Sequence, residues 1–101
     1  MGKTDNQVVE MNEIKLATPK KYCAIIHNDD TTTFDFVIFI LNEIYKKPIN
    51  ESIQLAMATH ESGSAVVMKG LRSYLETLSD EALKLASQYG FNEFAITNEL
   101  E

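Results

Sequence analysis

The chain has 101 residues, of which 45% are hydrophobic, so it can form one domain with a core of its own. Its formal net charge of −6 argues against a nucleic-acid partner, because such proteins need clustered lysine and arginine. It has no run near the ~20 apolar residues of a membrane span, no apolar leader typical of secretion, and one cysteine, Cys23, without an internal disulfide partner, so we expect a cytoplasmic protein.

Residues 1–20 differ from the rest of the chain. Charged and amide residues alternate there with isolated apolar ones, and neither the period of a strand nor that of a helix is sustained before Pro19. We expect a flexible N-terminal tail, which either carries a docking patch or is a leader without a role. Residues 21–101 would then form the folded domain.

The first two expected elements flank a short polar segment. Residues 22–26 are apolar and bounded by polar residues, which predicts a buried strand. Residues 34–45 are densely apolar and follow two candidate N-caps, Thr32 and Thr33, which favours a helix. Their β-branched content leaves a strand open as an alternative. Pro48 would stop this element.

A second helix is expected from Asn50, its candidate N-cap, to a close at Gly63. Residues 64–77 alternate loosely between apolar and polar, which predicts a long strand with a bulge at Gly70. The segment 71–78 could instead be helical.

The C-terminal part is expected to contain one more helix and one more strand. Ser79 is a good N-cap, and Gly90 is typical of the residue after a helix end. Residues 91–97 would form the last strand, followed by a short acidic end. The order β-α-α-β-α-β predicts an α+β domain, with a small antiparallel sheet packed on helices.

Four polar residues form the candidate site: Asn28, Asp29 and Asp30 after the first strand, and His60 on the apolar face of the second helix. They could be purely structural, as a turn and a histidine at the edge of the core. They could bind a metal, although no signature such as His-Glu-x-x-His is present. They could perform acid–base catalysis, although no nucleophile or activating base stands out.

A fourth interpretation is recognition of a primary amine. An ammonium group has three donors and one positive charge, so it suits a carboxylate, an amide oxygen and a neutral imidazole nitrogen together. Asn28, Asp30 and His60 supply that set.

Several segments together resemble the ClpS family, the adaptors that deliver N-degron substrates to the Clp AAA+ protease. The similar residues are Ile26-His27-Asn28-Asp29-Asp30, the threonine-rich turn and helix that follow, His60-Glu61-x-Gly63, the helix end from Ala86 to Gly90, and Ile96-Thr97-x-Glu99. The resemblance therefore extends over residues 20–99 of the chain.

The resemblance implies a protein that is not an enzyme, has no cofactor or metal, and binds N-terminal Leu, Phe, Tyr or Trp of its substrates. Its other partner would be the N-terminal domain of a Clp AAA+ ATPase, with no nucleic acid and no membrane. Asn28, Asp30 and His60 would hold the α-amino group, with Asp29 beside them shaping the loop. The side-chain pocket would be lined by Ile26, Thr32, Phe34, Val37, Ala56, Thr59 and Phe94. Residues 1–20 would correspond to the tail that engages the ATPase.

The chain also departs from the family at several positions. Phe34 and Ala56 stand where Met is usual, and Thr59 where Val is usual, so we expect an altered preference among the four N-terminal residues with an intact ammonium site. Ser73 and Leu78 replace an acidic and a basic residue of the docking surface, which points to a different ATPase or a variant contact.

Two alternatives share this order of elements. An inhibitor or decoy would occupy the Clp adaptor site without delivering N-degrons. The C-terminal domain of the ribosomal stalk protein has a similar fold, but it lacks the Asn-Asp-Asp segment and its histidine partner.

Overall fold

The computed structural model describes residues 20–101. The elements are β1 (Tyr22–His27), α2 (Phe34–Glu43), α3 (Ile49–Ser62), β2 (Ser64–Gly70), α4 (Arg72–Gln88) and β3 (Ala95–Leu100). The expected α+β class and the order β-α-α-β-α-β are confirmed. The expected tail lies outside the described residues, apart from Lys20. None of the helices in residues 20–101 is long and apolar enough to cross a membrane.

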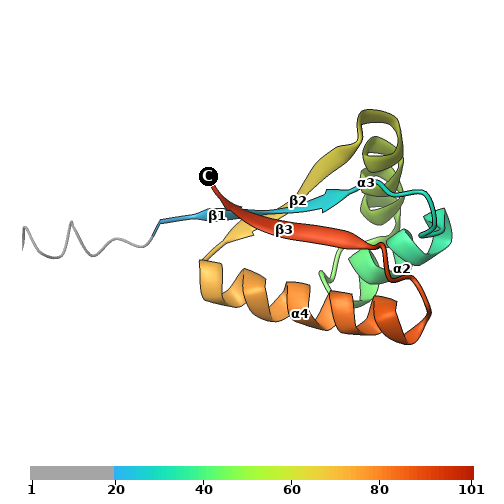
Figure 1. The fold of residues 1–101 in the computed structure, drawn as a ribbon. Helices are drawn as coiled ribbons and strands as arrows, with labels where there is room; N and C mark the ends of the chain where they lie inside the picture. The colour runs from blue at the N-terminus through green and yellow to red at the C-terminus, as the bar shows by residue number, and fades with distance from the viewer. Residues whose placement is uncertain (1–19) are drawn as a thin grey trace, which may run out of the picture.

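The three strands form one antiparallel sheet in the order β2-β1-β3. Helix α4 runs along one face of this sheet, while α2 and α3 lie at the end where β1 stops (Figure 1). At that end His27, the last residue of β1, pairs with Ser64 of β2 and with Ala95 of β3. The polar segment after His27 therefore leaves the centre of the sheet beside the two shorter helices.

The core lies between the sheet and the helices. Alternate residues of β1, Ala24 and Ile26, are fully buried, as the two-residue period of a strand requires. An aromatic cluster ties α2 to the chain after α4, because the ring of Phe36 lies 4.7 Å from that of Phe91 and 5.3 Å from that of Tyr89. This packing fixes α2, which forms one wall of the site described below.

Helix α4 begins at Arg72, so the prediction of a strand through residue 77 was wrong and the helical alternative for this segment was right. Helical spacing buries Leu75, Leu78, Ser79, Ala82 and Ala86 against the rest of the fold. Ser79 is not an N-cap, since its hydroxyl lies inside the helix, donates to the carbonyl of Glu76 at 3.0 Å and accepts from the amide of Asn98.

Three other boundaries also differ from expectation. The irregularity in the sheet lies at Val67 rather than Gly70, because Ala24 pairs with Met68 and Ile25 with Val66. Strand β3 covers Ala95–Leu100, including most of the expected acidic end, whereas residues 91–94 form a turn. The residue before α3 is Pro48 and not Asn50.

Two local predictions at helix ends are confirmed. The hydroxyl of Thr33 caps α2 by accepting a hydrogen bond from the backbone N–H of Phe36 at 3.2 Å. Helix α2 ends at Glu43, two residues earlier than expected, while Tyr45 remains buried. Gly63 ends α3 with a φ of 93°, a left-handed conformation that favours glycine.

Candidate functional site

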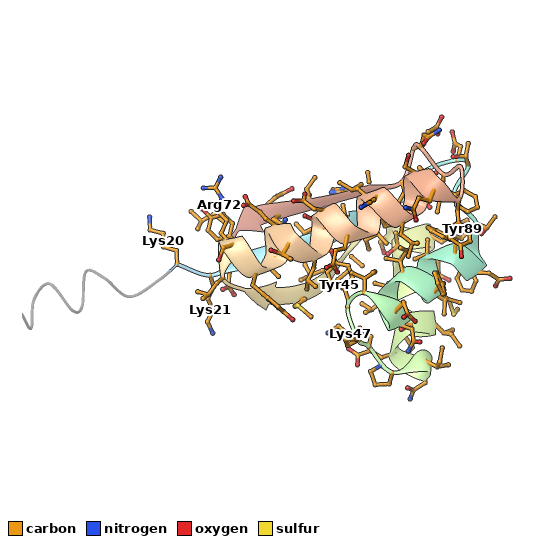
Figure 2. All side chains as sticks on the ribbon, turned by 90° about the horizontal axis from the view of Figure 1, so that it is seen from below. Lys20, Lys21, Tyr45, Lys47, Arg72 and Tyr89 are labelled. Carbon is orange, nitrogen blue, oxygen red and sulfur yellow. The ribbon has the colours of Figure 1, made fainter. Side chains whose placement is uncertain are left out.

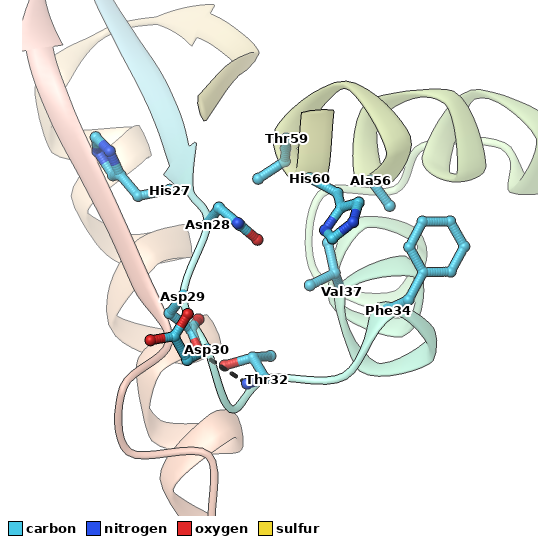
Figure 3. Close-up of a pocket in the computed structure, with 10 residues that line it drawn as sticks. All are labelled: His27, Asn28, Asp29, Asp30, Thr32, Phe34, Val37, Ala56, Thr59 and His60. Carbon is cyan, nitrogen blue, oxygen red and sulfur yellow. Dashed lines mark hydrogen bonds between the residues drawn. The ribbon is translucent and has the colours of Figure 1, made fainter. Parts of the chain in front are cut away.

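A cavity of about 220 Å³ lies where β1 ends, between the loop after it and the two shorter helices. It is lined by His27, Asn28, Asp29, Asp30, Thr32, Phe34, Val37, Ala56, Thr59 and His60 (Figure 3). All of these except His27 were named from the sequence as candidate site residues. The two remaining candidates, Ile26 and Phe94, are buried in the hydrophobic core and do not line the cavity.

Asp29 lines the cavity, but its hydrogen bonds are made within its own loop. Its Oδ1 accepts hydrogen bonds from the backbone N–H of Thr32 at 2.7 Å, and from the backbone N–H and hydroxyl of Thr31 at 2.9 and 3.2 Å. Partial burial acts to raise the pKa of Asp29, but the hydrogen bonds from Thr32 and Thr31 outweigh it and hold that pKa below its ordinary value. Asp29 is therefore a carboxylate that stabilises the loop.

Asp30, the next residue, is exposed at the cavity and takes part in none of the ion pairs within residues 20–101. Among residues 20–101, no lysine or arginine lines the cavity. Lys20, Lys21 and Arg72 gather at the opposite end of the sheet (Figure 2). The negative charge of Asp30 is therefore available to a cation that enters the cavity.

Asn28 and His60 come together through the backbone, although they are far apart in the sequence. The N–H of Asn28 donates to the carbonyl of Gly63 at 2.9 Å, and Gly63 itself closes the helix that carries His60. The side chains of Asn28 and His60 point toward one another across the cavity (Figure 3). The cavity lining thus carries an amide and an imidazole that face each other, together with the exposed carboxylate of Asp30.

Another wall of the cavity, which adjoins His60, is largely apolar. It consists of Phe34 and Val37 from α2, and of Ala56 and Thr59 from α3. Thr59 is nearly fully buried, and its hydroxyl donates to the carbonyl of Leu55 at 2.8 Å, so the polar atom is satisfied within its own helix. Phe34 is 42% exposed and forms part of the rim.

His27 is the lining residue that the sequence did not identify. Its side chain points away from the other lining residues, toward β3 (Figure 3). Its Nε2 lies 2.8 Å from the hydroxyl of Thr97, which donates its only proton to Glu99 at 3.1 Å, so the imidazole N–H is the donor to Thr97. The sequence signal that could have identified His27 was its position directly before Asn28, at the end of the first strand.

This geometry offers hydrogen-bond acceptors and a carboxylate next to an apolar surface. It suits a ligand that carries a cation next to an apolar side chain. Within residues 20–101, no three His, Cys, Asp or Glu side chains are grouped so that they could hold a metal ion.

The chain is similar to known proteins of one family. A family model described as ATP-dependent Clp protease adaptor protein ClpS matches residues 17–95. Relatives named ATP-dependent Clp protease adapter protein ClpS include one from Nautilia profundicola, 34% identical over 93 residues, which cover 92% of this chain and 95% of the relative. Another, from Lawsonia intracellularis, is 32% identical over 77 residues, which cover 76% of this chain and 71% of the relative.

A solved structure is also similar over most of its length. It is Agrobacterium tumefaciens ClpS2 bound to L-phenylalaninamide, with 34% sequence identity and a TM-score of 0.78. The likeness covers 82% of this chain and 99% of the other.

Proposed function

Since this chain belongs to the ClpS family of Clp protease adaptors, we propose that its cavity binds an N-terminal Leu, Phe, Tyr or Trp of substrate proteins for delivery to a Clp AAA+ unfoldase. The observation that carries the proposal is that Asn28 and His60 face each other in a cavity that the exposed carboxylate of Asp30 also lines. The apolar wall adjoins His60 and faces Asn28.

The polar edge suits an α-ammonium group. Such a group presents three donors, and the Asn28 amide oxygen, the Asp30 carboxylate and a His60 ring nitrogen can accept one each. An internal peptide nitrogen has one neutral donor at most, so it would leave Asp30 covered without a counter-charge, which is unfavourable. This difference is the basis for selecting free N-termini. Phenylalaninamide, the ligand of the Agrobacterium protein, also has a free amino group.

The apolar wall suits the side chain of the first residue. An aromatic side chain buries roughly 150–250 Å². At about 25 cal/mol per Å², this burial contributes on the order of 4–6 kcal/mol before the cost of association. The ammonium contact supplies selectivity for N-termini, and the wall supplies selectivity for large apolar residues.

Two wall residues set the shape of this pocket. The small side chain of Ala56 is almost fully buried and leaves space beneath the rim, whereas Phe34 adds an exposed ring at the rim. A ring at this place can pack against an aromatic ligand side chain. We therefore propose that Phe, Tyr and Trp bind more tightly than Leu.

A decoy or inhibitor of the Clp adaptor site is the second candidate, because helix α4 departs at two positions from the docking surface expected of a delivering adaptor. Leu78 is only 8% exposed, so this position serves the core and cannot present a charge to a docking ATPase. Ser73 is exposed but neutral. A decoy would contact the ATPase without delivering N-degrons.

Fluorescence anisotropy with labelled peptides tests the proposed function. Peptides that begin with Leu, Phe, Tyr or Trp would be compared with the same peptides acetylated at the N-terminus and with a peptide that begins with Ser. We expect micromolar or tighter binding only for the free, large apolar N-termini. The absence of binding to every free N-terminus would reject the adaptor function and favour the decoy.

A further inference from the structure

A row of exposed apolar side chains on α3 has no role in the cavity described above. Ile49, Ile53 and Met57 are 54%, 37% and 46% exposed. They are spaced four residues apart, so they lie on one side of the helix as a continuous row. We call these three residues the α3 strip.

The α3 strip reaches the edge of the cavity. Ala56, which lines the cavity, directly precedes Met57, and His60 follows Met57 by three residues on the same side of the helix. The inward side of α3 is a different one, formed by the buried Ser52, Ala56 and Thr59. The apolar surface therefore continues out of the cavity and along α3, past the imidazole.

The mouth of the cavity has two unlike edges. Asn28 and Asp30 make one edge polar, and the loop that carries them is acidic. On the other side, Phe34 lies beside Ala56 (Figure 3), and the α3 strip continues from there. A chain that leaves the cavity meets either the acidic loop or an apolar helix surface.

The chemistry of an N-terminal residue decides between these two edges. Its α-carbon carries the ammonium, the side chain and the carbonyl that leads to the second residue. With the ammonium at Asn28, Asp30 and His60 and the side chain in the cavity, the third bond starts beside His60, where the α3 strip is the adjacent apolar surface. We propose that the α3 strip binds the second residue of the same substrate peptide and that it prefers a large apolar side chain there.

This inference rests on the proposed function, since it requires the first residue to occupy the cavity. It adds a second determinant to the substrate class, because a peptide with an apolar second residue covers Met57 and Ile53 on binding. Burial of part of a leucine side chain is expected to strengthen binding by about fivefold to tenfold over a polar side chain of similar size.

The test uses four peptides that begin with Phe and differ only in the second residue, which is Leu, Gln, Lys or Glu. Their dissociation constants would be measured by fluorescence anisotropy with the full chain. Leu and Gln are similar in size, so their ratio reports on polarity. We expect the Phe-Leu peptide to bind about fivefold to tenfold more tightly than the Phe-Gln peptide.

The double substitution Ile53→Ser and Met57→Ser should reduce this ratio to about one. Leu83→Ser is the matched control, because Leu83 is an apolar residue on α4 that is 39% exposed and lies outside both the cavity and the strip. It should leave the ratio unchanged. Thermal unfolding of each variant would check that the fold is retained.

The outcomes separate this inference from the function on which it rests. If no peptide with a free N-terminal Phe binds, both are overturned. If all four bind equally, or if the ratio survives the double substitution, the α3 strip is not a binding surface while the cavity still is. Tightest binding of the Phe-Lys peptide would also overturn the inference, since it would assign the second residue to the acidic loop.

Discussion

The backbone N–H of Asn28 donates a hydrogen bond to the carbonyl oxygen of Gly63, with 2.9 Å between the two atoms. This bond joins the loop after β1 to the end of α3, and so it sets the spacing between the Asn28 amide and the His60 imidazole. The conformation of Gly63 is part of the same arrangement, because its φ of 93° turns the chain from α3 into β2.

Gly63→Ala should weaken peptide binding as well as stability. A Cβ at Gly63 would meet no atom within 4 Å, so the cost comes from the left-handed conformation alone, about 1 kcal/mol. Gly90→Ala is a matched control, since Gly90 has a φ of 85° and equally free space. Chemical unfolding should show similar losses for both variants, and anisotropy should show weaker binding only for Gly63→Ala. If Gly63→Ala bound the peptide as tightly as Gly90→Ala does, the turn at Gly63 would not position the site.

Asp30→Ala should reduce affinity for free N-termini by about tenfold or more, because it removes the only free negative charge among the proposed ammonium ligands. Asp80→Ala changes the net charge equally at an exposed position of α4 and should have little effect. The dissociation constant of one peptide that begins with Phe would be measured for the native protein, Asp30→Ala and Asp80→Ala. Tight binding by Asp30→Ala, or of an acetylated peptide, would exclude the ammonium mechanism.

Asp29→Asn should change how stability depends on pH. The pKa of Asp29 is lower in the folded protein than in the unfolded chain, so its carboxylate stabilises the fold above the unfolded pKa. That contribution is lost as the pH falls through the folded pKa. The native protein should therefore lose more stability than Asp29→Asn between neutral and acid pH. The free energy of unfolding of both proteins would be measured with urea at several pH values. If it changed with pH in the same way for both, the loop hydrogen bonds would not depend on the charge of Asp29.

Phe34→Met and Ala56→Met, which introduce the residues usual in the family, should change the order of preference in different ways. Phe34→Met removes the rim ring and should lower the preference for Phe over Leu. Ala56→Met places a longer side chain where Ala56 is 2% exposed. By filling the pocket, it should weaken the binding of peptides with N-terminal Trp more than that of peptides with N-terminal Leu. A four-peptide competition assay measures both orders. Unchanged orders would show that these two residues do not set specificity.

The sequence by itself determined the elements that have strong local signals. The choice of Thr32 or Thr33 as a cap and the helix ends at Gly63 and Gly90 follow from short-range backbone chemistry. The structure caps α2 with Thr33 and has both glycines at positive φ. The polar candidates Asn28, Asp29, Asp30 and His60 could be named because a compact polar segment interrupts apolar runs. Their convergence on one cavity followed only from the resemblance to the ClpS family.

The tertiary structure decided what depends on contacts between distant residues. Leu71 precedes α4 without any side-chain cap, so no local signal marks that helix start, and burial of Leu75 and Leu78 selects the helix. The same packing draws Phe94 into the core. The position of the bulge at Val67 depends on register with β1. Such choices are made by long-range packing, which overrides weak local preference and leaves no trace in a short stretch of sequence.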